Sequence, residues 1–187
     1  MASGGEAARV PGHEIAELFH ARWSPRAFTG EEIPEPTLLG LFEAARWAPS
    51  AMNAQPWRFV YARRGTPAFD RFLSALVPAN RAWAGRASAL IGVLSARTMR
   101  LPGKEEAVPA PSHSFDAGAA WAQLALQAEL WGWSTHAMGG FDREAARQVM
   151  AVPDDHVVEV IVAVGRRGDA STRRFPSRRP SAPWPSS

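Results

Sequence analysis

Hydrophobic residues follow two alternating spacings along the chain. Compact runs of β-branched and aromatic residues, typical of strands, occupy residues 56–63, 88–96 and 156–165, with a shorter strand or turn at 134–141. Apolar positions three or four residues apart, the pattern of one helical face, occur in residues 13–21, 37–48, 67–76 and 142–150. Strands separated by helices predict an α+β protein built in layers around a mixed sheet.

Proline and glycine divide the chain between these elements. Residues 22–36 contain three prolines and a glycine, which predicts a structured loop. Residues 97–112 also contain three prolines and predict a long loop or flap. After Gly165 the chain is rich in Arg, Pro and Ser without periodicity. We therefore expect a disordered N-terminus at residues 1–12 and one domain over residues 13–187 that ends in an Arg/Pro-rich tail.

One expected helix, within residues 114–133, is apolar or small on nearly every side. A helix with no polar face must be buried on all sides. In a chain of 187 residues this indicates either the centre of the domain or an interface between subunits. Asp142 is the expected N-cap of the helix that comes next.

Composition narrows the functional class. A chain with 46% hydrophobic residues and this length can form one domain with a substantial core. It contains no cysteine, which excludes disulfides, thiolate metal sites and a cysteine nucleophile. The five histidines share no metal-ligand spacing, so we expect surface or capping roles for them. Because neither a run of about 18 apolar residues nor an apolar leader is present, we expect a cytoplasmic protein without a membrane partner.

The net charge of +3 is concentrated in the tail. Residues 166–187 hold six of the 21 basic residues and one of the 18 acidic residues, so the rest of the chain is slightly acidic. A nucleic-acid-binding domain is expected to carry a basic face with stacking aromatics, and the core shows no such pattern. We therefore expect no nucleic-acid partner.

The first candidate for binding chemistry is the stretch "RWSPRAF". Arg22, Ser24 and Arg26 stand at alternating positions, so their side chains point the same way in an extended loop. Guanidinium groups and a hydroxyl are donors matched to phosphate. A solvated loop without a ligand explains the same spacing.

Two further segments suit a flat ligand. In "APSAMNAQPWRF", the amides of Asn53 and Gln55 can read the edge of a heteroaromatic ring, or can form an Asx-type turn. In "STHAMGGFD", two glycines allow backbone to lie close to a ring, or simply make a turn. The tail carries three arginine doublets that either stay in a disordered segment or return to an anion: Arg166/Arg167, Arg173/Arg174 and Arg178/Arg179.

Taken together, these segments resemble one family. The stretch "RWSPRAF…IPEPTLLGLFEAARWAPSAMNAQPWRFVYA" is similar to the opening of the FMN-dependent nitroreductase family, with its Arg-x-Ser-x-Arg loop and its Ala-Pro-Ser-x-x-Asn-x-Gln-Pro-Trp motif in order and spacing. The resemblance continues through "FDAGAAWAQLALQAELWGWSTHAMGGFD" and "VIVAVGRRGD" and covers residues 13 to about 180. It implies the nitroreductase-like fold, a three-layer α/β/α sandwich with a mixed central sheet, in an intertwined homodimer with FMN at the subunit interface.

The resemblance also implies roles for individual residues. Arg22, Ser24 and Arg26 are implied to bind the FMN phosphate and ribityl chain. The other implied FMN contacts are Ser50, Asn53 and Gln55 along the isoalloxazine ring, Met138, Gly139 and Gly140 near flavin N5, and Arg178 and Arg179 at the phosphate. Gln55 and Arg58 are the candidates for stabilising the N1/O2 edge of the reduced flavin.

The implied activity is that of an FMN oxidoreductase with a ping-pong mechanism. NAD(P)H passes hydride to FMN and leaves, and a nitroaromatic, quinone or conjugated carbonyl acceptor then takes its place. No side chain needs to act as a nucleophile, so no catalytic residue is assigned. Two alternatives stay open: a superfamily member that uses reduced flavin differently, such as a dehalogenase or flavin-fragmenting enzyme, and a flavin-binding protein without turnover.

Overall fold

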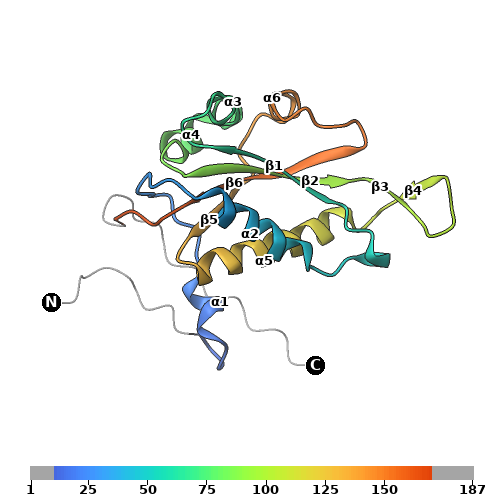
Figure 1. Ribbon diagram of the computed structural model, residues 1–187, viewed down its shortest axis with the longest axis horizontal. Helices are drawn as coiled ribbons and strands as arrows, with labels where there is room; N and C mark the ends of the chain where they lie inside the picture. The colour runs from blue at the N-terminus through green and yellow to red at the C-terminus, as the bar shows by residue number, and fades with distance from the viewer. Residues whose placement is uncertain (1–10, 170–187) are drawn as a thin grey trace.

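The computed structural model describes residues 11–169, which form three layers (Figure 1). A four-stranded sheet lies in the middle, and helices cover both of its faces. The α/β/α architecture expected from the sequence is confirmed. The expectations for residues 1–10 and for the tail beyond residue 169, including Arg178 and Arg179, lie outside the described residues.

The central sheet has the strand order β1-β2-β6-β5. Every adjacent pair of these strands is antiparallel, so the described sheet is antiparallel where a mixed sheet was expected. Arg63 at the end of β1 pairs with Ala89 at the start of β2, so the helical connection leaves and re-enters at the same end of the sheet. The presence of a helix between two strands was therefore not enough to predict whether the strands are parallel or antiparallel. The strands are β1 (Trp57–Arg63), β2 (Ala89–Ala96), β5 (Ser134–Met138) and β6 (His156–Gly165).

Two hydrophobic cores form, one on each face of the sheet. Residues of β2 alternate between them, because successive side chains of a strand point to opposite faces. Ile91 and Val93 join one core, whereas Leu90 and Leu94 join the other. The first core is covered by α2 (Glu35–Arg46) and α5 (His113–Leu130), and the second by α3 (Pro67–Ala75), α4 (Pro78–Ala84) and α6 (Arg143–Val149).

Three elements differ from the sequence-based expectation. The first helix is only α1 (Glu17–Ala21), which has no side-chain hydrogen bond at its N-cap and buries no residue. The expected loop or flap contains a hairpin of β3 (Thr98–Arg100) and β4 (Ala107–Pro109). Helix α4 was not expected, because its short span gave no clear apolar period, yet it buries Trp83 and Ala84.

Asp142 caps α6 as expected. Its Oδ1 accepts a hydrogen bond from the N–H of Ala145 at 3.0 Å. We expect Asp142→Ala to lower the free energy of unfolding by about 1 kcal/mol, since the N–H of Ala145 in the first turn of α6 loses its acceptor. Urea denaturation measures this loss. Glu144→Ala on the same helix is the control, and an equal loss in both variants would show that the cap does not stabilise α6.

Candidate functional site

The loop of residues 22–26 is fixed to the core. Pro25 is buried, and Phe28 just beyond it is 3% exposed, with its ring centroid 6.1 Å from that of Trp83. Phe28 occupies the space beside Gly165, where an added Cβ would lie 2.7 Å from its ring. Contacts with the core therefore fix the conformation of this loop, whereas a fully solvated loop would have no such contacts.

His136 of β5 holds the middle of the same loop. Its Nδ1 bonds the carbonyl of Pro25 at 2.9 Å, so Nδ1 must carry the proton. The imidazole ring lies 4.7 Å from the Trp83 ring. Burial lowers the pKa of His136 below its usual 6.5, the Arg26 cation lowers it further, and backbone hydrogen bonds to Pro25 and Ser24 oppose both. A surface or capping role was the wrong expectation for this histidine.

The chain after β6 runs beside this loop. The N–H of Gly168 donates to the carbonyl of Ala27 at 2.9 Å. Arg167 donates from Nε to the Ser134 hydroxyl at 2.8 Å, and its guanidinium carbon lies 5.9 Å from the centroid of the Trp23 ring. Its guanidinium group also forms an ion pair with Glu129, so the charge beside the loop is compensated within the chain. The sequence offered Arg166/Arg167 as one of three doublets that either stay in a disordered segment or return to an anion, whereas the family resemblance implied Arg178 and Arg179 at the phosphate.

Two buried indole donors lie in or beside this loop. The indole N–H groups of Trp23 and Trp83 are buried and have no acceptor within the part of the chain that the structure describes. A buried donor without an acceptor costs about 1–3 kcal/mol, so an acceptor-rich group is expected here. Arg22, Ser24 and Arg26 belong to the same loop, and their side chains suit an anion with several oxygens. The residues present thus fit a phosphate group.

The turn before β1 holds two amides in an unusual backbone conformation. Met52, Asn53 and Gln55 have φ angles of 51°, 54° and 47°, in the left-handed region that favours glycine. Gln55 Nε2 donates to Asn53 Oδ1 at 2.8 Å, and the Gln55 N–H donates to the Ser50 hydroxyl at 3.0 Å. Such strain, on the order of 1–3 kcal/mol for each residue, is concentrated at binding sites. This segment can therefore be both a structural turn and an edge that binds a ligand.

Asp116 ties this turn to α5. Asp116 is only 4% exposed. Its carboxylate accepts hydrogen bonds from the N–H of Ala51 at 3.2 Å and from the Ser112 hydroxyl at 3.0 Å. The position of the turn therefore follows the position of the helix. The sequence carried no signal for this contact, because Ala51 and Asp116 lie 65 residues apart.

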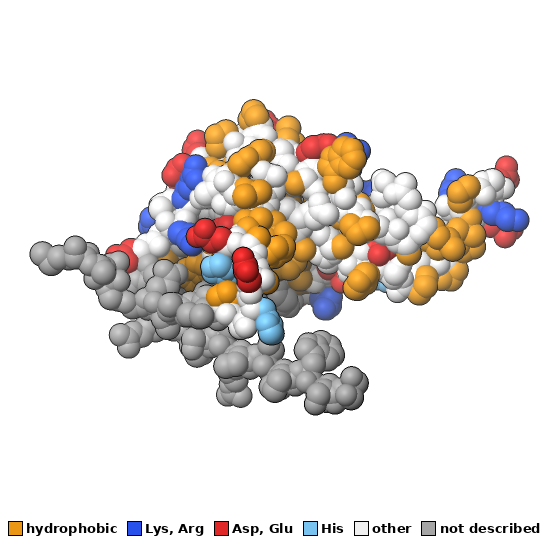
Figure 2. All heavy atoms as spheres, turned by 90° about the horizontal axis from the view of Figure 1, so that it is seen from below, with side chains coloured by type: hydrophobic (Ala, Val, Ile, Leu, Met, Phe, Trp, Pro, Cys, Tyr) orange, Lys and Arg blue, Asp and Glu red, His pale blue; other side chains and the backbone are white. Residues whose placement is uncertain are grey.

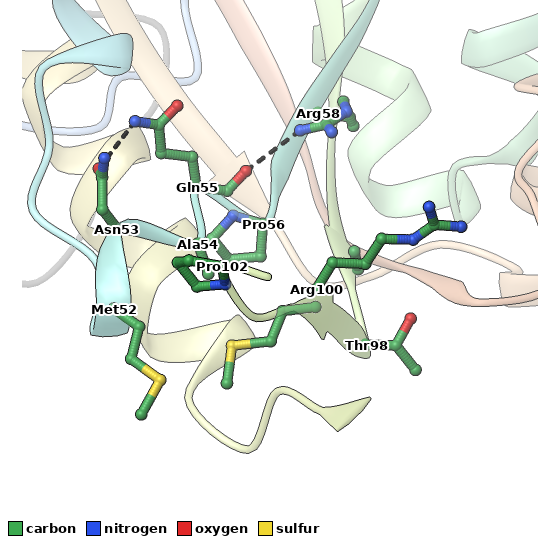
Figure 3. A pocket seen from close by; sticks show the side chains of 11 residues that line it. Met52, Asn53, Ala54, Gln55, Pro56, Arg58, Thr98, Arg100 and Pro102 are labelled. Carbon is green, nitrogen blue, oxygen red and sulfur yellow. Dashed lines mark hydrogen bonds between the residues drawn. The ribbon is translucent and has the colours of Figure 1, made fainter. Parts of the chain in front are cut away.

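A cavity of about 380 Å³ opens between this turn and the β3–β4 hairpin. Figure 3 shows Asn53 and Gln55 on one side of it, and Arg58 and Arg100 on the other. Arg58 donates to the carbonyls of Gln55 at 3.1 Å and Trp57 at 2.7 Å, so it braces the turn. No carboxylate is among the described residues that line the cavity, which makes it a positively charged space.

The glycine turn follows β5. Met138 is 2% exposed and belongs to the core, so only its backbone can face a ligand. Gly140 lies against α4, where a Cβ would stand 2.8 Å from Asn80 Nδ2 and 3.0 Å from Val77. At Gly139 a Cβ would meet no heavy atom within 4 Å among the described residues. Gly140 is thus explained by packing, and Gly139 is the position whose backbone is open to a ligand.

The structure does not bring all of these segments together in one chain. The 22–26 loop and the glycine turn adjoin β5, whereas the amide turn of residues 50–55 precedes β1. These strands are the two edges of the sheet, three strand spacings or about 14 Å apart. Figure 1 shows the blue loop at the left of the molecule and the teal turn toward the right, on the side of the β3–β4 hairpin.

An apolar surface extends over α1, α2 and α5. Figure 2, seen from this side, shows hydrophobic side chains spread across the face. The helix expected to be buried on all sides packs on the sheet along one side only, and Phe115 at its start is 81% exposed. Other large hydrophobic residues exposed on these helices or beside their ends are Ile15, Phe19, Leu39, Trp47, Leu130 and Trp131.

Comparison with known proteins identifies the class that this fold and site define. Residues 20–166 match the nitroreductase family, and the chain belongs to this family. A crystal structure of an oxidoreductase containing FMN has 41% sequence identity, a TM-score of 0.85, and coverage of 92% of this chain and 86% of its own. The NADH dehydrogenase of Thermus thermophilus is 30% identical over 184 residues, which cover 84% of this chain and 87% of the relative.

Other relatives match over shorter segments. Nitroreductase NfnB of Mycolicibacterium smegmatis is 44% identical over 63 residues, 34% of this chain and 26% of its own length. Relatives from Streptomyces coelicolor and Rhodopseudomonas palustris are matched over 40% and 36% of their length. The chain thus spans less than half of these curated relatives.

Residues 11–169 contain neither a candidate metal site nor a candidate membrane span. No group of three or more His, Asp or Glu side chains is placed to hold a metal ion in this range. In the same range, no helix has both the length and the apolar content needed to cross a membrane.

The lowered pKa of His136 predicts a pH dependence of stability. An unfolded histidine takes up a proton near pH 6.5, whereas folded His136 resists protonation. The free energy of unfolding should therefore fall as the pH drops from about 7.5 through 6.5, and level off below the folded pKa. Thermal melts of the wild type and His136→Asn between pH 7.5 and 5 measure this. The wild type should lose more stability than the variant on acidification, and identical slopes would contradict the prediction.

Proposed function

We propose that this protein is an FMN-dependent oxidoreductase that uses NAD(P)H to reduce electron-poor acceptors, acting as a homodimer. The observation that carries the proposal is the donor-rich loop of residues 22–26, held in place before any ligand binds and accompanied by two indole N–H groups without described acceptors. Family membership and the FMN named in the similar crystal structure support it. The cytoplasmic location stays the expectation from the sequence.

The phosphate end of FMN is assigned to the Arg22, Ser24 and Arg26 side chains. Arginine offers a planar fork of donors that matches phosphate oxygens, and serine adds a short hydroxyl donor. Arg167 stands beside the same loop, but its charge is compensated by an ion pair with Glu129. Arg178 and Arg179 stay candidates for this end from the sequence alone.

The ring end of FMN is assigned to two segments. Ser50, Asn53 and Gln55 would read the ring edge, and the backbone from Met138 to Gly140 would approach flavin N5, with Gly139 most open. Because the first segment lies at the opposite sheet edge from the phosphate loop, we assign it to the flavin of the partner subunit. The exposed apolar face of α1, α2 and α5 is the surface that a second copy would cover.

When bound, FMN would supply the redox chemistry, which is hydride transfer from NAD(P)H to a second substrate in the same place. The residues of this chain bind and orient both ends of the cofactor. They also exclude water through the apolar interface. No described side chain is required as a nucleophile, in keeping with a ping-pong cycle.

The cavity beside the amide turn suggests which acceptors are favoured. Met52 and Met99 line it together with the guanidinium groups of Arg58 and Arg100. Thioethers adapt to flat apolar ligands, and guanidinium groups attract carboxylates. Nitroaromatics, quinones and conjugated carbonyl compounds that carry a negative charge are therefore the proposed acceptor class.

The assignment of the phosphate end predicts a difference between two flavins. Arg22→Ala and Arg26→Ala should each weaken FMN about tenfold to a hundredfold, because each loses a charge-assisted contact of about 1.5–3 kcal/mol. Riboflavin lacks the phosphate and should bind the variants almost unchanged. Fluorescence titration of the apoproteins measures both affinities. Asn53→Ala is the control and should weaken both flavins alike; equal losses in the arginine variants would move the phosphate site elsewhere.

The apolar face predicts the oligomeric state. A chain of 20.3 kDa should behave in light scattering as a particle of twice that mass. Phe115→Asp would place a charge in the interface, so it should shift the protein toward monomers and lower flavin binding in parallel. A wild-type monomer that retains FMN would exclude the interface.

The positive cavity predicts a preference that a matched pair of acceptors can test. Arg100→Gln should lower kcat/KM for 4-nitrobenzoate about fivefold, the equivalent of about 1 kcal/mol for an exposed charge pair, and leave the neutral 4-nitrobenzamide unchanged. Lys104→Gln on the same hairpin does not line the cavity and is the control. Steady-state NAD(P)H oxidation is the assay. Equal effects on both acceptors would contradict the anionic class, and no turnover with any acceptor would favour a non-catalytic flavin-binding protein.

A further inference from the structure

The bond between His136 and Pro25 joins two distant parts of the chain. The residues are 111 positions apart, and the bond of 2.9 Å is from the middle of β5 to the middle of the 22–26 loop. Pro25 has no N–H, so its carbonyl is its one backbone group that can form a hydrogen bond. Fixing this carbonyl sets the direction of the peptide unit that joins Pro25 to Arg26, and the restricted φ of Pro25 relates this unit to the one it shares with Ser24.

The imidazole also shares a platform with one of these neighbours. Its ring lies 4.7 Å from Trp83, and the guanidinium carbon of Arg26 lies 6.0 Å from the same indole ring. Trp83 is 4% exposed and anchored in the core beside Phe28. His136 and Arg26 are therefore placed relative to each other by one buried aromatic side chain, and loss of the imidazole would leave Trp83 without one of its neighbours.

The protonation state of the ring agrees with this role. Burial and the neighbouring Arg26 cation both favour the neutral imidazole. A neutral ring with its proton on Nδ1 holds the Pro25 carbonyl while adding no second cation beside Arg26. A hydrogen-bond donor of this shape, not a charge, is what the position uses.

We propose that His136 is a positioning residue for the phosphate-binding loop, which it holds through the Pro25 carbonyl so that Ser24 and Arg26 meet the phosphate of a flavin nucleotide. This inference rests on the proposed function. His136 does not touch the phosphate in this account. It acts through the loop, so its loss affects the phosphate contact and not the contacts to the flavin ring.

Two substitutions separate the hydrogen bond from the packing. His136→Phe keeps an aromatic ring beside Trp83 but removes the donor, whereas His136→Asn keeps a donor on a shorter side chain. His136→Phe should weaken FMN about five- to tenfold, the value of one hydrogen bond, and leave riboflavin unchanged. His136→Asn should recover most of the FMN affinity. His156→Asn is the matched control, because its Nδ1 bonds only the neighbouring Asp155 among the described residues.

The titrations use purified apoprotein with FMN and riboflavin, and circular dichroism confirms that each variant is folded. An equal loss for both flavins in His136→Phe, or no loss in either, would overturn the proposal. So would His136→Asn binding FMN as weakly as His136→Phe. If the wild type itself does not prefer FMN to riboflavin, the proposed phosphate site is wrong. This outcome contradicts the proposed function and is distinct from the outcomes that contradict the role of His136.

A second measurement does not depend on flavin or on either variant. Ring ¹⁵N shifts of His136 in the wild-type apoprotein at pH 7.5 should be those of a neutral imidazole with its proton on Nδ1. A proton on Nε2 alone, or a charged ring, would overturn the proposed contact to Pro25 even if FMN binds tightly.

Discussion

The width of the central sheet is the constraint on which the candidate site depends. Antiparallel pairing in the order β1-β2-β6-β5 makes β1 and β5 the two edges, and each edge positions one of the binding segments that the family motif contains. In the proposed function, a flavin held by the loop beside β5 meets the amide turn of a second chain. The proposal therefore couples dimerisation to cofactor binding.

Both binding segments take their shape before a ligand arrives. The 22–26 loop is held by Phe28 in the core and by His136, and the amide turn is held on α5 by Asp116. Preorganisation of this kind lowers the ordering cost of binding and leaves donors without acceptors in the free protein. The left-handed residues of the turn add strain that the surrounding contacts sustain. The stability of each segment thus comes from residues distant in sequence.

The sequence predicted the individual segments better than it predicted how those segments contact one another in space. Alternating arginines, the amide motif and the paired glycines have local spacings, and the apolar patterns of the strands and of α5 are also local. Strand direction, by contrast, depends on where a connection re-enters the sheet, and the hairpin in residues 97–112 depends on pairing across a proline-rich segment. His136 and Asp116 act on partners 111 and 65 residues away, so no periodicity or motif could identify them. The contact between Gly140 and Asn80 was not predicted either, because Asn80 belongs to α4, which the sequence pattern did not predict.

The central claim, that each flavin site combines the phosphate loop of one subunit with the amide turn of the other, is tested most directly by mixed dimers. One subunit carries Arg22→Ala with Arg26→Ala, the other Asn53→Ala with Gln55→Ala, and different affinity tags isolate the heterodimer. Neither parental homodimer should bind FMN tightly. In the heterodimer one site combines both damaged segments and the other combines both intact segments, so we expect one tightly bound FMN per dimer. A heterodimer that binds FMN as weakly as its parents would contradict it, because every site would then be built within a single chain.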